Sequence, residues 1–134
     1  MSTDIRPEIS KKSKWWISKH RYYELKHFCL QYGEWRELYL SCIDRRDSEI
    51  VRTNPEWKDP TGRSAAMREE CLRKMRMVEE CCYAASDELG SYILKAVTEG
   101  LSYVNLRMMH GIPCGRDMFY DRYRKFYYIL NNRK

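Results

Sequence analysis

The chain has 134 residues, of which 43% are hydrophobic and 33% are charged, and its net charge is +6. This balance fits one compact, well-solvated helical protein and excludes a collagen-like or fully disordered chain. The longest apolar run, residues 126–130, is far shorter than the ~20 residues that a membrane-spanning helix needs. The first residues lack the basic and then apolar pattern of a secretory signal, so we expect a cytoplasmic protein without membrane contact.

Positive charge gathers toward both ends of the chain. Residues 11–27 carry six Lys or Arg side chains against one Glu, and residues 101–134 carry seven against two Asp. Residues 28–100 are mildly acidic. This distribution favours ends that face a polyanion, although a charged, solvated surface would show it too.

The six cysteines stand at positions that look helical and half-buried. No C-x-x-C pair occurs, and none of the three histidines is spaced to share a metal with two cysteines. We therefore expect reduced thiols that act as small core residues, with neither a metal site nor a cofactor.

The first half of the chain predicts two helices and a connection before a third helix. Residues 1–13 are polar and aperiodic, which indicates a mobile arm. Helical periodicity follows over 15–32, is interrupted by Gly33, and resumes from Trp35 until about residue 46. Turn-forming dipeptides make 47–63 a long exposed loop, after which Ser64 is the expected N-cap of a helix that ends near residue 85.

The second half predicts three further helices. Asp87 is the expected cap of a helix that Gly100 ends, and Ser102 begins a short helix with Leu106 and Met109 on its apolar face. A turn over 111–115 contains Pro113 and precedes a last helix over 116–131. The prediction is an all-α bundle of about six helices. Its parts are a mobile arm (1–13), an N-terminal helical body (14–86) with the loop 47–63, and a helix-turn-helix module (87–134).

The last helix has two distinct faces. Steps of three and four residues place Phe119, Tyr123, Phe126 and Leu130 on the buried side. The outward positions, with Arg116 on the flank, are basic enough for the helix to bind duplex DNA as a recognition helix does. The alternative is that the turn is only a corner between two packed helices and that the last helix has no DNA-binding role. We expect Arg116, Asp117 and Tyr120 at base edges and Arg122, Arg124 and Lys125 at phosphates. A second basic contact is predicted at Lys11, Lys12, Lys14 and Lys19.

Two segments carry a resemblance to a known group of proteins: residues 16–26 (WISKHRYYELK) and residues 100–126, which begin GLSY and end IPCGRDMFYDRYRKF. They look like small prophage proteins of Gram-positive bacteria. Those proteins resemble the RinA/ArpU-type phage transcription activators, whose C-terminal module is similar to region 4 of sigma factors. The resemblance implies control of phage genes inside a bacterial host, with Arg116 to Lys125 on the recognition helix and host RNA polymerase as a further candidate partner.

Other functions stay open at this stage. The chain lacks G-x-S-x-G, P-loop and H-E-x-x-H motifs, so we expect no enzyme. A phage accessory protein that binds a host protein, such as an anti-CRISPR inhibitor, fits the small size and basic ends. A small-terminase-like packaging protein would also use a helix-turn-helix on DNA. A homodimer through the apolar seam of the third helix is the alternative to an intramolecular bundle.

Overall fold

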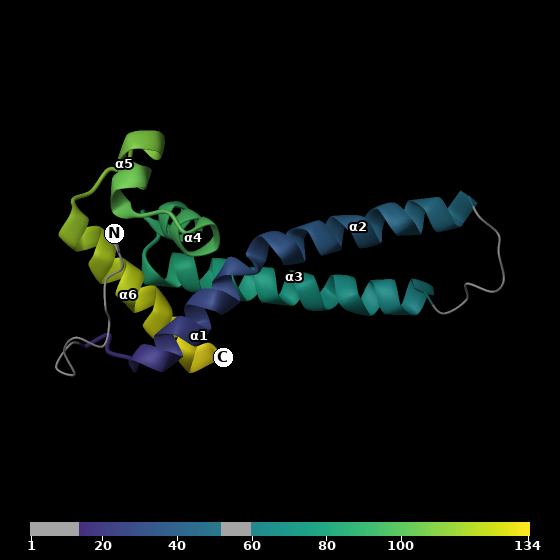
Figure 1. The fold of residues 1–134 in the computed structure, drawn as a ribbon, viewed down its shortest axis with the longest axis horizontal. Helices are drawn as coiled ribbons and strands as arrows, with labels where there is room; N and C mark the ends of the chain where they lie inside the picture. Colours follow the sequence, from purple (N-terminus) through teal and green to yellow (C-terminus); the bar gives the residue numbers. More distant parts are fainter. Residues whose placement is uncertain (1–13, 52–59) are drawn as a thin grey trace. The chain divides into compact units, whose positions relative to one another are not determined.

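The computed structural model describes residues 14–51 and 60–134, and all regular structure in these two ranges is α-helical (Figure 1). The all-α prediction is confirmed. The helices, in chain order, are α1 (Lys19–Leu30), α2 (Tyr32–Val51), α3 (Pro60–Ala85), α4 (Gly90–Glu99), α5 (Tyr103–His110) and α6 (Arg116–Arg133).

Several helix ends follow from local sequence. Gly100 and Gly111 end α4 and α5 in the left-handed conformation, with φ of 73° and 61°, which glycine adopts without steric cost. Ser102 and Asn105 form a reciprocal capping box at the start of α5. These three predicted boundaries are confirmed.

Other predicted boundaries are wrong. Pro60 takes the first helical position of α3, so Ser64 lies inside the helix rather than at its cap. The Ser86 hydroxyl accepts from the Leu89 amide ahead of α4, where Asp87 was the expected cap. The first helix breaks at Gln31, which leaves Gly33 inside α2.

The predicted loop 47–63 is partly helical, because α2 continues to Val51 and α3 begins at Pro60. The remainder of that loop, residues 52–59, and the predicted arm, residues 1–13, lie outside the described residues.

The described chain divides into two compact units. The hairpin unit, Tyr32–Arg76, contains α2 and the first part of α3. Within it Cys42 and Cys71 are buried, and the Lys74 ammonium lies 5.7 Å from the centre of the Trp35 ring. Helices α2 and α3 therefore pack side by side in this unit.

The larger unit combines α1 with the end of α3 and all of α4, α5 and α6. Helix α1 contacts α4 and α6, and α5 contacts the same two helices. The predicted boundary at residue 86 separated α1 from α4, α5 and α6. In the structure, α1 belongs to the same compact unit as these three helices. The largest fully buried side chains of the unit are mostly aromatic or aliphatic: Tyr22, Leu25, Cys29, Val78, Leu89, Ile93, Val97, Leu106, Phe119, Phe126, Tyr127 and Leu130.

Candidate nucleic-acid interface

The corner between α5 and α6 is braced by Tyr103, the first residue of α5. Its hydroxyl donates to the carbonyl oxygen of Cys114, 2.7 Å away, and its backbone N–H donates to the Tyr120 hydroxyl at 3.3 Å. Its ring lies 5.9 Å from that of Phe119. Tyr103 thus ties the turn 111–115 and the first turns of α6 to the start of α5 through its side chain and its backbone amide.

The inner face of α6 is the predicted one. Phe119, Phe126 and Leu130 are completely buried, and Tyr123 is 8% exposed. The outward orientation predicted for Tyr120 is wrong, since this side chain is only 6% exposed and its hydroxyl accepts the Tyr103 bond. The buried face is wider than one stripe because α6 packs against α1, α4 and α5 together.

The start of α6 is open to solvent. Arg116 and Asp117 are exposed, and Gly115 at the N-cap supplies no side chain to bond the first amides. Free amides at a helix N-terminus suit an anion such as a phosphate. The Arg116 guanidinium lies 5.6 Å from the centre of the Tyr120 ring, which positions this charge at the beginning of the helix.

Further along α6 the predicted phosphate contacts differ in their surroundings. Arg122 pairs with its neighbour Asp121, so part of its charge is balanced within the protein. Arg124 and Lys125 are half-buried at the side of the helix. The predicted DNA-binding residues therefore share one helix but not one environment.

Sequence reasoning missed a cluster that forms around Trp15. The ammonium groups of Lys14 and Lys125 lie 5.2 Å and 5.4 Å from the centre of its ring. The Trp15 ring also meets the ring of Tyr128 edge-on at 5.4 Å. The segment ahead of α1 is therefore held against α6, and this lysine pair, Lys14 with Lys125, joins the two predicted basic contacts. The sequence signal for this surface was the positive charge at both ends of the chain, which did not show that the two ends meet.

The other members of the predicted second contact are not part of this cluster as described. Lys19 is exposed at the first position of α1. Lys11 and Lys12 lie outside the described residues.

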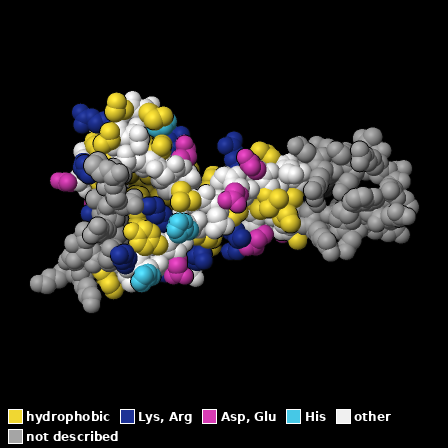
Figure 2. Space-filling view, viewed as in Figure 1, with side chains coloured by type: hydrophobic (Ala, Val, Ile, Leu, Met, Phe, Trp, Pro, Cys, Tyr) yellow, Lys and Arg dark blue, Asp and Glu magenta, His cyan; other side chains and the backbone are white. Residues whose placement is uncertain are grey.

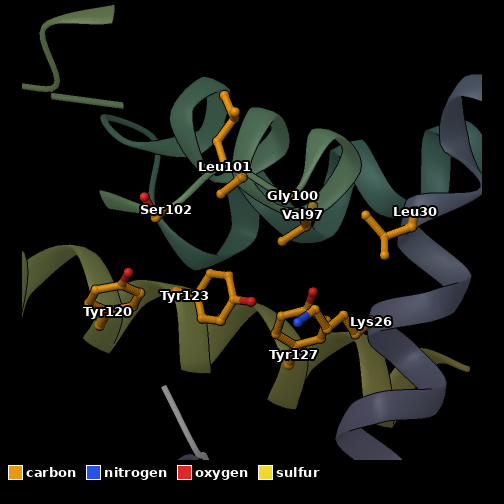
Figure 3. Close-up of a pocket in the computed structure, with 10 residues that line it drawn as sticks. Lys26, Leu30, Val97, Gly100, Leu101, Ser102, Tyr120, Tyr123 and Tyr127 are labelled. Atoms are coloured by element: carbon orange, nitrogen blue, oxygen red, sulfur yellow. The ribbon is translucent and has the colours of Figure 1, made fainter. Parts of the chain in front are cut away.

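A small pocket lies between α1, the end of α4 and α6 (Figure 3). Its volume is about 40 Å³, and Lys26 and the hydroxyl-bearing side chains of Tyr120, Tyr123 and Tyr127 help to line it. The Tyr123 hydroxyl is hydrogen-bonded to that of Tyr22 at 3.0 Å. Burial raises the pKa of Tyr127 well above its usual range. The lining mixes these polar groups with apolar side chains such as Leu30 and Val97, and a pocket of this size accommodates water, so its size and lining alone define no particular ligand.

No protein-family model, curated protein or solved structure matches the chain. None of the helices in the part of the chain that the structure describes is long and apolar enough to cross a membrane. All six cysteines are free thiols.

Proposed function

We propose that the chain is a phage-encoded transcription regulator that binds duplex DNA with α6, using α5, the turn 111–115 and α6 as a helix-turn-helix. The observation that carries the proposal is the exposed start of α6, with Arg116 beside amides that no side chain caps. The opposite side of the same helix is fixed in an aromatic core. A reading helix needs this combination of a rigid back and an open, positively charged end.

The lysine pair supplies a second basic contact further along α6. Lys14 and Lys125 contact one indole ring, so both ammonium groups can reach one stretch of DNA backbone. Phosphate contacts of this kind fix the orientation of a protein on DNA without reading its sequence. We assign Lys14, Lys125 and Arg124 to phosphates and Arg116 to a base edge. Tyr120 is omitted from the interface because its side chain is buried.

The resemblance to RinA/ArpU-type regulators supports the biological part of the proposal. It covers both basic segments, residues 16–26 and the α5–α6 region, and implies control of phage genes. The exposed start of α6 is compatible with that role. The lysine pair would give the protein a second contact with DNA, one that does not depend on the base sequence.

The proposal is tested by fluorescence anisotropy of a labelled duplex at stepped salt concentrations. Wild-type protein should bind with an affinity that falls steeply with salt. Lys14→Ala and Lys125→Ala should each lower the slope of log affinity against log salt by about 1, as expected for one lost phosphate contact.

Lys74→Ala is the matched control, because Lys74 also lies over a tryptophan ring but belongs to the hairpin unit. It should bind as wild type does. Absence of duplex affinity at low salt would refute the proposal. Equal losses in Lys74→Ala and Lys125→Ala would show that the affinity follows overall charge rather than this surface.

A further inference from the structure

The pocket between α1, α4 and α6 is bordered by the buried hydroxyl of Tyr127. This residue is 1% exposed, and its hydroxyl has no hydrogen-bond partner among the residues that the structure describes. The hydroxyls of Tyr22 and Tyr123, whose rings each lie 5.1 Å from that of Tyr127, are bonded to each other. A buried donor without an acceptor is costly, so an occupant of the pocket that accepts this bond would stabilise the fold.

The Tyr127 hydroxyl is placed to donate into the pocket. Figure 3 shows it pointing from α6 toward the wall that carries Val97 and Gly100. Burial raises the pKa of Tyr127 well above its usual range, so the hydroxyl keeps its proton at neutral pH. An occupant must therefore offer this hydroxyl an acceptor atom.

The rest of the lining combines positive charge with an apolar wall. Of the ten lining residues, Lys26 alone is charged, and Leu30 and Val97 supply carbon surface. Glu24 and Glu99, which are close to the pocket in sequence, are exposed and do not line it. In Figure 2, Lys or Arg side chains adjoin hydrophobic ones on the face where α1, α4 and α6 meet. These features favour an occupant that has both a negative charge and a carbon chain.

The volume of the pocket, about 40 Å³, limits the size of the occupant. One water needs roughly 10–15 Å³ of such space, so the pocket has room for about three waters or for one molecule of about three or four non-hydrogen atoms. Water alone would leave the positive charge and the carbon surface without a match. Inorganic phosphate is larger, and its four oxygens need more donors than Tyr127 and Lys26 supply.

We propose that the pocket binds a short-chain carboxylate, one oxygen of which accepts a hydrogen bond from the Tyr127 hydroxyl. The negative charge faces Lys26, and the carbon chain lies against Leu30 and Val97. This binding site goes beyond DNA binding and does not depend on it.

The test is ¹³C NMR on protein labelled at the tyrosine Cζ atoms, the carbons that bear the hydroxyls. Sodium acetate is the probe and replaces sodium chloride at constant sodium concentration. The Tyr127 signal, assigned from its absence in Tyr127→Phe, should shift and reach saturation. The signal of Tyr128, which lies on the same helix outside the pocket, should not shift. Acetamide has the same size without the charge and should bind at least tenfold more weakly.

Variants identify the groups that bind acetate, with the Tyr123 signal as the reporter. Tyr127→Phe and Lys26→Met should each weaken acetate binding about tenfold, as for the loss of one hydrogen bond to a charged group. Tyr128→Phe and Lys19→Met are the matched controls and should bind acetate as wild type does, because neither residue lines the pocket. Tyr127→Phe should stay folded, since it removes a hydroxyl that makes no bond within the described chain.

Three results would overturn the proposal. The first is a Tyr127 signal that does not respond to acetate or that shifts without saturation, which would leave a pocket filled by water only. The second is equal binding of acetamide and acetate. The third is an equal loss of affinity in Tyr127→Phe and Tyr128→Phe. No DNA is present in these samples, so their outcome is separate from that of the DNA-binding test.

Discussion

At the scale of single residues, the core of the larger unit holds groups that ionise only when the chain unfolds. Burial raises the pKa values of the Cys29 and Cys82 thiols and of the Tyr127 hydroxyl far above their ordinary ranges. In the unfolded chain the two thiols lose their protons from about pH 8.5 and the phenol from about pH 10, whereas in the folded chain all three stay protonated there. The free energy of unfolding should therefore fall as pH rises, by up to about 1.4 kcal/mol per pH unit for each group.

Urea unfolding in reducing buffer between pH 7 and pH 10.5 measures this effect. Cys29→Ala should make the decline shallower, because one ionising group is removed from the unfolded state. A stability that stays constant over this pH range would contradict the burial of these groups.

Individual orientations on helices were only partly predictable from the sequence. The spacing of Phe119, Tyr123, Phe126 and Leu130 identified their common face, because α6 is long enough for periodicity to dominate. Tyr120 directly follows Phe119 and is not part of the three-and-four spacing. Its burial depends on contact with Tyr103 of α5. Met109 was expected inward with Leu106, but α5 has only two turns and packs through Tyr103 and Leu106 alone.

At the scale of elements, α6 depends on its inner face for its place in the fold. Phe126 is completely buried there, so Phe126→Ala should lower the free energy of unfolding by about 3–5 kcal/mol. Met109→Ala is the control, since an exposed position typically changes stability by no more than about 0.5 kcal/mol. Chemical denaturation of both variants gives the comparison. Equal midpoints for Phe126→Ala and wild type would mean that this face of α6 is not part of the core.

Helix ends were predictable where one residue determines the conformation. A glycine with positive φ is a local requirement, and Gly100 and Gly111 were identified for that reason. Helix starts were harder, because several capping residues stand close together and tertiary contacts select among them. Pro60 precedes Ser64, and Ser86 precedes Asp87.

At the scale of the whole molecule, the main unpredicted feature is long-range. Trp15 meets Tyr128 and Lys125 across more than a hundred residues, and no periodicity of the chain encodes such a contact. The same holds for the grouping of α1 with α4 and α6. Charge counts suggested that both ends of the chain face one polyanion, and the lysine pair gives that suggestion a specific location.

Selection of bound sequences from a random duplex pool tests DNA reading by α6 most directly. The wild-type protein should enrich one motif. Arg116→Ala should lose discrimination at one base pair of that motif, worth about 1–3 kcal/mol, whereas Lys125→Ala should bind all sequences more weakly and keep the motif. Failure to enrich any motif, or the same change of motif in both variants, would contradict the account.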